Sequence, residues 1–282
     1  MPYERTDVPR MSSHDRFYRV VVDALAHDRL TLPTLPEVAH GIRCLVRNED
    51  VSAARLAREI LRDPAIAVRL IRVANSAAMR GGHRVDNVQQ AVTRLGFDYT
   101  RMLVDGLALE QMFRARDREL HDRLLLCWRD SVEIAALART LAEQCTLLHP
   151  EMAMLAGLVH RVGVLPILKL AETHAHTVDS DHALDAAIDA LAPRVGRMIL
   201  QAWHFPPELV EVPMLWPDAS RDHDGAADYP DVICVAALRL RGAQDAYAPA
   251  FRKLDLEAGF ALDEAGPLGG GYRESLRQLE AS

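Results

Sequence analysis

The side chains best suited to bind an anion gather around a pair of glycines, Gly81-Gly82. The candidate residues are Arg69, Arg72, Arg80, His83 and Arg84. Guanidinium groups bind phosphate and carboxylate through paired hydrogen bonds, and the N–H groups of a glycine-rich loop can hold the same anions. The pattern predicts a site for a small anionic ligand or for a carboxylate of a partner protein. The alternative, which is the usual state of exposed arginines, is a solvated helix face paired with acids such as Glu59 and Asp63.

A second group of polar residues, between positions 174 and 189, has the residue types of a metal site without its spacing. Its members are His174, His176, Asp179, Asp181, His182, Asp185 and Asp189. The acids lack the glycine and the closing glutamate of a calcium-binding loop. Two histidines that are two positions apart diverge by about 200° on a helix, so His174 and His176 cannot share an ion. We expect a solvated helix face here.

The hydroxyl and thiol groups do not predict a nucleophile. Ser76 follows Asn75 at the expected end of a helix, where asparagine tolerates left-handed geometry and serine can bond freed backbone groups. No relay of a histidine and an acid can be assigned to this serine. The cysteines are far apart in the sequence, which indicates unpaired thiols in a reducing compartment. They are Cys44, Cys127, Cys145 and Cys234.

These residues lie in segments that are predicted to be helical. The main predicted helices cover residues 14–27, 64–79, 88–95, 97–113, 120–145, 181–203, 206–215 and 229–240. Pro64 stands at a first helical position, where its missing N–H costs nothing, whereas Pro193 predicts a break within 181–203. No stretch alternates in the way that a strand does. Because the composition is aliphatic and only 5% aromatic, we predict an all-α, multi-helix fold.

The predicted helices form one domain, over residues 14–242, made of two helical lobes that meet near residue 115. The lobes cover about 14–115 and 116–242. The polar residues 1–13 contain two prolines and are expected to be loose. Residues 243–282 are expected to form a C-terminal extension with a glycine-rich loop at Gly269-Gly270-Gly271 and a short helix.

The charge and the hydropathy of the chain argue against several classes of partner. A formal net charge of −7 disfavours general affinity for nucleic acid or for an anionic membrane. The first residues lack the apolar stretch of a signal peptide, and no apolar run approaches the ~20 residues needed to span a bilayer. We therefore predict a cytoplasmic protein with no membrane contact, no direct contact with nucleic acid and no cofactor.

A series of short motifs resembles the HDOD family of bacterial regulatory proteins, which are relatives of the HD-type metal phosphohydrolases. Each motif is weak alone, but the set follows the family order over roughly residues 30–240. The residues that carry the resemblance are Leu32, Pro33, Leu35, Pro36, Asp63, Pro64, Asn75, Ser76, Gly96, Trp128, Gly157, Gly196, Trp203 and Pro206. The resemblance implies an all-α fold with an HD-phosphohydrolase-like C-terminal lobe, and a role in bacterial signalling or gene regulation.

The resemblance also implies where an HD-type hydrolase would hold its metal. The adjacent His-Asp pair of such enzymes aligns with His160-Arg161, and a guanidinium has no lone pair to offer a cation and repels it. The other expected ligands align with Asp130, Ala192 and Trp216-Pro217. Only His160 and Asp130 keep ligand atoms, as vestigial positions, whereas a metal site needs at least three. We expect neither a bound metal nor a catalytic residue.

His160 then requires a structural explanation. On a helix it lies opposite Leu155 and Leu158 and beside Ala156 and Gly157. Small residues on that face allow another helix to approach closely. We therefore expect His160 to be a buried, hydrogen-bonded side chain in a seam between two helices.

Three functions are compatible with the sequence. The leading hypothesis is a non-enzymatic signalling module that docks onto another regulatory protein, or responds to a small anionic effector, through helix packing. The second is a divergent metal-dependent phosphodiesterase or nucleotide hydrolase that uses His160 and Asp130. The third is a binding protein for a nucleotide-like anionic signal at the arginine cluster that contains Arg69 and Arg72.

Overall fold

All regular structure in the described part of the chain is helical. The computed structural model describes residues 16–46, 52–76, 83–242, 248–257, 260–263 and 266–280. No strand occurs within these ranges, which confirms the all-α prediction. The expectation for residues 1–13 lies outside the described residues.

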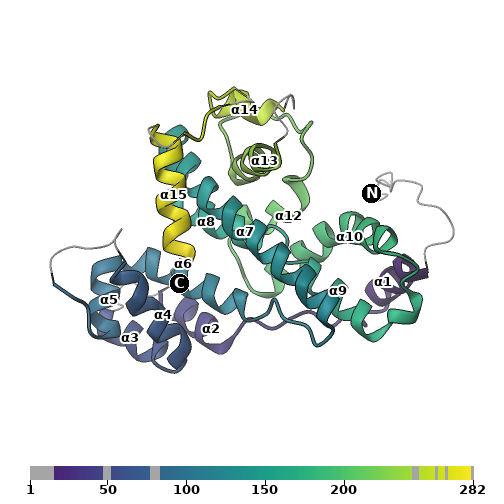
Figure 1. Ribbon diagram of the computed structural model, residues 1–282, viewed down its shortest axis with the longest axis horizontal. Coiled ribbons are helices and arrows are strands. Elements are labelled where there is room, and N and C mark those ends of the chain that lie inside the picture. Colours follow the sequence, from purple (N-terminus) through teal and green to yellow (C-terminus); the bar gives the residue numbers. More distant parts are fainter. Residues whose placement is uncertain are drawn as a thin grey trace, which may run out of the picture.

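Helices α2 to α6 form the N-terminal lobe, at the left of Figure 1. They are α2 (Glu37–Val46), α3 (Ala53–Ile60), α4 (Pro64–Ala74), α5 (Val88–Leu95) and α6 (Phe97–Glu110). Capping side chains fix where the helices begin. Ser52 accepts a hydrogen bond from the N–H of Arg55, and Asp63 accepts two from the first turn of α4. Pro64 occupies the first turn of α4, as predicted.

The first helix lies at the opposite end of the molecule from α2 to α6. α1 (Arg16–Ala26) packs against α9 (Val164–Thr173) and α10 (Asp181–Ala202), at the right of Figure 1. Its buried face contains Phe17 and Val21, and the segment 31–36 that follows has no regular structure and carries the chain across to α2. The predicted N-terminal lobe is therefore corrected: it begins at α2 and not at residue 14.

The long helix α7 (Arg118–Cys145) joins the lobes and forms the centre of the second one. It packs against α8 (Pro150–Val159), α13 (Tyr229–Leu240) and α15 (Pro267–Glu280). The contact with α8 is close because Gly157 has no side chain; a Cβ there would lie 2.4 Å from the Cα of Ala135. The shorter elements are a 3₁₀ helix (Ala175–Thr177), α11 (Pro207–Val210), α12 (Val212–Leu215) and α14 (Pro249–Lys253).

Helix α10 continues through Pro193 without the predicted break. A proline in a helix interior removes one N–H donor and destabilises the helix by about 3 kcal/mol. Leu191 and Val195, on either side of it, are buried. Burial of such a side chain contributes roughly 1.5–3 kcal/mol, so the packing of this face offsets the effect of the proline.

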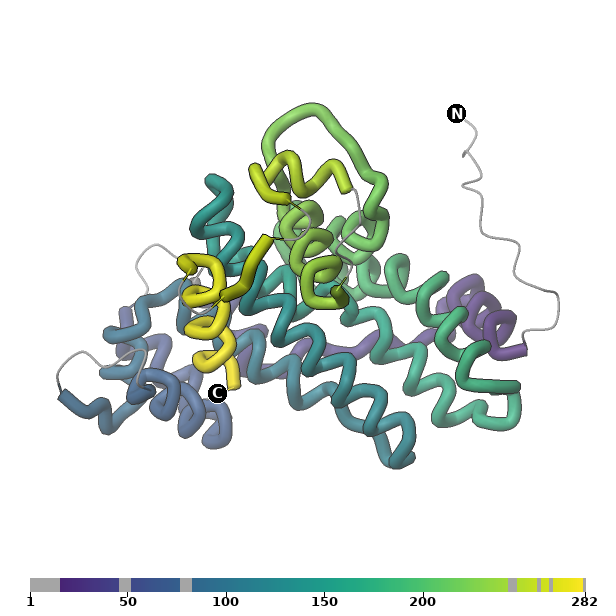
Figure 2. Tube along the Cα trace, turned by 45° about the horizontal axis from the view of Figure 1, so that its top comes forward, coloured from purple at the N-terminus to yellow at the C-terminus, as the bar shows by residue number. Residues whose placement is uncertain are grey.

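The glycine-rich segment 269–271 is part of α15 and not a loop, which corrects the prediction for the C-terminal extension. Each glycine weakens a helix interior by about 1 kcal/mol relative to alanine. A Cβ at Gly269 would lie 1.9 Å from the carbonyl oxygen of Asp263, and one at Gly271 would lie 2.8 Å from Cγ2 of Thr140. The glycines therefore allow α15 to lie closely against its neighbours, and Figure 2 shows it running alongside α7.

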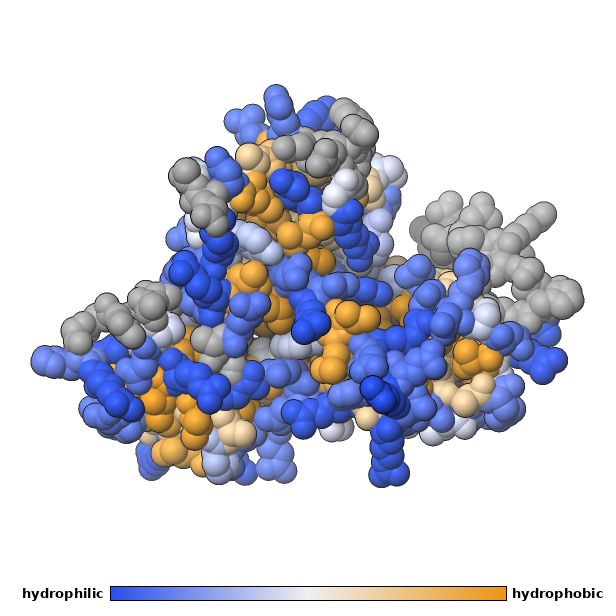
Figure 3. Space-filling view, viewed as in Figure 1, coloured by the Kyte–Doolittle hydropathy of each residue, from blue (hydrophilic) through white to orange (hydrophobic). Residues whose placement is uncertain are grey.

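The visible surface in Figure 3 is mostly hydrophilic, with apolar patches that include one over α3 and α4. One helical stretch, Pro150–Thr173, is long and apolar enough to cross a membrane by length and composition alone, which corrects the expectation that no run approaches that length. Its most apolar window is 83% buried inside the protein. The stretch therefore serves as a core element around α8 and α9.

Candidate functional sites

His160 ends α8 and is 2% exposed. Its Nδ1 lies 2.6 Å from the carbonyl oxygen of Gly157, and because a carbonyl only accepts, the Nδ1–H donates this hydrogen bond. The Nε2 atom is then an acceptor, and it has no hydrogen-bond partner among the described residues. The Trp216 ring stands at 82° to the imidazole, with 4.8 Å between the ring centroids. The environment agrees with the expectation of a buried histidine in a helix seam.

The charge state of His160 follows from its surroundings. Burial, opposed by the Gly157 hydrogen bond and aided by the guanidinium groups of Arg161 and Arg241, lowers the pKa of the imidazole to about 3. The side chain is therefore neutral near pH 7. Arg161 also pairs with Asp130 at 3.9 Å.

The family resemblance assigned several residues to the positions of metal ligands in HD-type hydrolases. All of these residues except Asp130 line the same cavity. One cavity of about 250 Å³ is lined by His160, Arg161, Ala192, Trp216, Pro217 and Arg241 among others. A cation in this cavity would meet one imidazole nitrogen and the carboxylate of Asp189, which are fewer ligands than the three a metal site needs, and two guanidinium groups that repel it. Asp130 is already paired with Arg161. The residues present do not fit a metal ion.

Another group of metal-ligand types, which the sequence analysis did not identify, lies at the start of α13. Ligand atoms of His223, Asp228 and Asp231 lie within 4.8 Å of one another. Arg221 donates hydrogen bonds to both carboxylates, at 3.0 Å to Asp228 and 2.9 Å to Asp231. The two aspartates also form the capping box of α13. The group is a helix-capping network whose charge is balanced by arginine.

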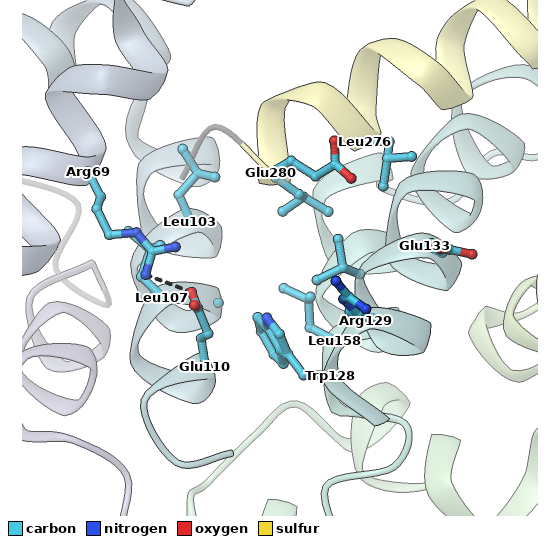
Figure 4. Close-up of a pocket in the computed structure, with 13 residues that line it drawn as sticks. Arg69, Leu103, Leu107, Glu110, Trp128, Arg129, Glu133, Leu158, Leu276 and Glu280 are labelled. Carbon is cyan, nitrogen blue, oxygen red and sulfur yellow. Dashed lines mark ion pairs between the residues drawn. The ribbon is translucent and has the colours of Figure 1, made fainter. Parts of the chain in front are cut away.

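A cavity of about 460 Å³ lies between the two lobes (Figure 4). Arg69 of α4 and Glu110 of α6 form an ion pair of 2.6 Å on one wall. Trp128 of α7, one of the residues that carry the family resemblance, stands on the other wall and packs against Phe113 with ring centroids 5.1 Å apart. Helix α15 adds Leu276 to the same wall. The cavity thus brings one predicted anion-binding arginine next to a carboxylate that neutralises it.

The other predicted anion-binding residues have different surroundings. Arg72 is exposed on α4. Arg84 forms an exposed ion pair of 3.6 Å with Asp86, and the carbonyl of His83 accepts a hydrogen bond from an arginine of α5. Arg80 lies outside the described residues. Anion binding by this group stays a prediction.

Asn75 has a role that its position at a helix end did not reveal. Its φ of −99° is not left-handed, contrary to the expectation from the sequence. The side chain instead clips two segments together: Nδ2 donates to the carbonyl of Val85 at 2.7 Å, and Oδ1 accepts from the Val85 N–H at 2.9 Å. Ser76, which was expected to bond a freed backbone group, has a buried hydroxyl without a partner among the described residues.

The proline-rich entry to α2 and the Trp-x-Phe-Pro motif meet where the lobes join. The Nε1–H of Trp203 donates a hydrogen bond to the carbonyl of Pro33 at 2.9 Å. Arg43 of α2 lies over the ring of Phe205, 3.5 Å from its centroid. Its Nε also pairs with a carboxylate oxygen of Asp105 at 3.3 Å.

Asp105 is a buried charge that the sequence analysis missed. It is 0% exposed, in the middle of α6. Burial raises the pKa of its carboxyl to about 6, while Arg43 and Arg101 act against the rise. The signal was present in the sequence, because an acid interrupts the apolar run from Leu103 to Leu107.

Comparison with known proteins agrees with the fold and the motifs. The HDOD domain family matches residues 32–215. A structure from Shewanella amazonensis SB2B, named as a proposed metal-dependent phosphohydrolase, is 29% identical with a TM-score of 0.81, and the match covers 95% of this chain and 100% of that one. An HDOD domain protein of unknown function from Geobacter sulfurreducens is 20% identical with a TM-score of 0.61, over 94% and 89% of the two chains.

A structure from Marinobacter aquaeolei VT8, named as a proposed signal transduction protein, has 20% identity and a TM-score of 0.62, over 98% of this chain and 67% of that one. No protein of curated function matches. The all-helical fold, with its HD-like second lobe, places the chain among the relatives of HD-type phosphohydrolases. Because the family match covers more than half of the sequence, the chain belongs to the HDOD domain family.

Proposed function

We propose that this protein is a signalling module that acts by binding another regulatory protein and that it catalyses no reaction. The observation that carries the proposal is the set of side chains around His160. A guanidinium, an indole and a methyl group stand where an HD-type hydrolase needs ligand atoms. The single imidazole in this cavity keeps its free nitrogen buried.

The electrostatics support the same conclusion. A divalent ion at about 4 Å from one guanidinium is repelled by roughly 8 kcal/mol at an effective dielectric constant of about 20. Arg161 and Arg241 both lie close enough to His160 to lower its pKa, so both would oppose an ion at its Nε2. One imidazole nitrogen and the carboxylate of Asp189 are fewer donors than a metal site needs to offset this repulsion.

Docking by helix packing has a candidate surface on the N-terminal lobe. Leu61 and Val68, at the end of α3 and on α4, are 56% and 58% exposed. Arg72 is exposed on the same helix as Val68. Figure 3 shows apolar surface over these two helices. A partner helix with an apolar face and acidic flanks would complement this mixture of apolar and basic groups.

The test is metal content and phosphodiesterase activity of the purified protein. We expect elemental analysis to find no stoichiometric manganese, iron, zinc or magnesium, and phosphodiester substrates to remain intact with added Mn²⁺. Asp130→Ala and His160→Ala are the informative variants, with Asp122→Ala, an exposed acid on the same helix, as the matched control. Activity that both informative variants abolish and the control keeps would establish the hydrolase alternative and refute the proposal.

A further inference from the structure

A cavity of about 300 Å³ lies beside the Arg43–Asp105 pair, at the junction of the two lobes. It is lined by His40, Arg43, Cys44, Arg101, Trp203, His204 and Pro206. No carboxylate belongs to this lining in the part of the chain that the structure describes. Two guanidinium groups and two imidazoles therefore face one small space, with an indole and a proline ring as its apolar wall.

The positive charge of Arg101 is only partly balanced within the protein, because the buried Asp105 carboxyl on which it acts also pairs with Arg43. The ion pair of Arg101 with Asp98 is long, at 3.8 Å, and the Asp98 side chain is 60% exposed, so that solvent screens the interaction. Its Nε is buried and has no hydrogen-bond partner among the described residues. A second, weak contact joins Arg101 to the sulfur of Met152 at 4.0 Å. An anion in the cavity would supply a counter-charge to the Arg101 guanidinium, which lines it.

Arg43 is held in place before any ligand arrives. Its guanidinium lies 3.5 Å from the centroid of the Phe205 ring, its Nε faces Asp105, and its Nη1 donates to the carbonyl of Trp203 at 3.5 Å. A guanidinium fixed in this way loses little conformational entropy when it binds an anion. His204, which is exposed with a φ of +56°, stands at the rim from the second lobe.

We propose that this cavity binds a small phosphate-bearing molecule between α2, α6 and the segment 203–206. Phosphate suits the site better than carboxylate because its terminal oxygens can accept from two guanidinium groups and two imidazoles at once. The volume is at the lower end of the range for ligand pockets, roughly 300–1,000 Å³, which favours a small phosphorylated compound over a peptide or a dinucleotide. Because the ligand would contact both lobes, its binding would stabilise their arrangement.

The inference goes beyond the proposed function, since it adds a small ligand to a module defined by a protein partner. The two proposals can fail separately. The proposed function depends on the cavity at His160, and the phosphate site depends on the cavity at Arg101. It also places the anion site away from the residues around Gly81-Gly82 to which the sequence pointed.

The test is titration calorimetry of the full chain with inorganic phosphate and with adenosine monophosphate, at an ionic strength held constant with chloride. Arg101→Gln is the informative variant, because it removes the charge and leaves the Arg43–Asp105 pair in place. Arg72→Gln is the matched control, since this arginine is exposed and belongs to the cluster predicted from sequence. We expect Arg101→Gln to weaken binding by about tenfold or more and the control to bind as the wild type does.

A second variant keeps the proposal testable if Arg101→Gln does not fold. His204→Gln changes an exposed side chain at the rim, and we expect it to weaken binding by a few-fold. Tighter binding of adenosine monophosphate than of phosphate would indicate an organic phosphate as the ligand, and the reverse would indicate the free ion. The proposal is refuted if neither probe produces heat, if Arg101→Gln binds as the wild type does, or if the control alone loses binding.

Discussion

Asp105 should make the folded protein less stable as the pH rises from about 4 to about 6, which is the reverse of the trend for a carboxylate in a favourable salt bridge. Burial raises the pKa of its carboxyl from an ordinary 3.8 to about 6. Below the lower value the group is protonated in both the folded and the unfolded chain. Between the two values the unfolded chain loses the proton first, so the equilibrium shifts toward unfolding.

The size of the effect follows from the same two pKa values of Asp105. Each pH unit between them lowers the free energy of unfolding by about 1.4 kcal/mol, so the whole interval accounts for about 3 kcal/mol. Above about pH 6 the carboxyl is ionised in both states and its contribution no longer changes. The Arg43 charge limits the pKa rise without cancelling it, because desolvation is the larger effect.

The assay is urea unfolding of the wild type and of Asp105→Asn at several values between about pH 4 and about pH 8. The amide cannot ionise, so the variant should gain on the wild type by about 3 kcal/mol over the interval. The attraction to Arg43 acts only on the ionised carboxylate and is already included in the folded-state pKa of about 6, so it needs no separate correction to the slope. Asp98→Asn, on the exposed side of the same helix, is the matched control. A difference between wild type and Asp105→Asn that is flat with pH would show that the carboxyl is not desolvated, and the reasoning would be wrong.

Two further predictions concern close contacts. Gly157→Ala would place a Cβ 2.4 Å from the Cα of Ala135 and force α7 and α8 apart; we expect a loss of about 1–3 kcal/mol in urea unfolding, and an unchanged midpoint would contradict the close approach. Asn75→Ala would remove both hydrogen bonds to Val85 and leave its backbone groups unpaired, at a loss of about 1–3 kcal/mol. Amide hydrogen exchange at Val85 should accelerate in this variant. Retained protection would show that the two Asn75–Val85 hydrogen bonds do not hold the segment in place.

The sequence sufficed where the signal was local. Asp63 and Pro64 mark the start of α4 because a cap and its first-turn proline act within one turn. The sequence-based interpretation of His160 also held, since its hydrogen-bond partner, Gly157, lies three residues away on the same helix. The fold class followed from periodicity and composition in the same way.

The sequence failed where distant packing decides the conformation. Pro193 and the glycines from 269 to 271 break helices by local propensity, yet buried neighbours keep α10 and α15 intact. The partner of α1 is more than a hundred residues away, so no local pattern placed it with α9 and α10. Asp105 was visible as an acid in an apolar run, but its meaning depends on Arg43, which only the fold brings beside it.

The packing around His160 in the second lobe bears on the proposal that the protein holds no metal. A ligating imidazole must keep a nitrogen accessible to the ion, whereas the Nε2 of His160 is buried near Trp216. Trp216, which the resemblance aligns with a ligand position, offers no lone pair to an ion, and Arg241 lies over its ring, 5.4 Å from the centroid. Restoring one ligand, for example with Arg161→Asp, would therefore still leave Trp216 and Ala192 without donor atoms. Packing and charge at this position therefore both support the proposal that the protein holds no metal here.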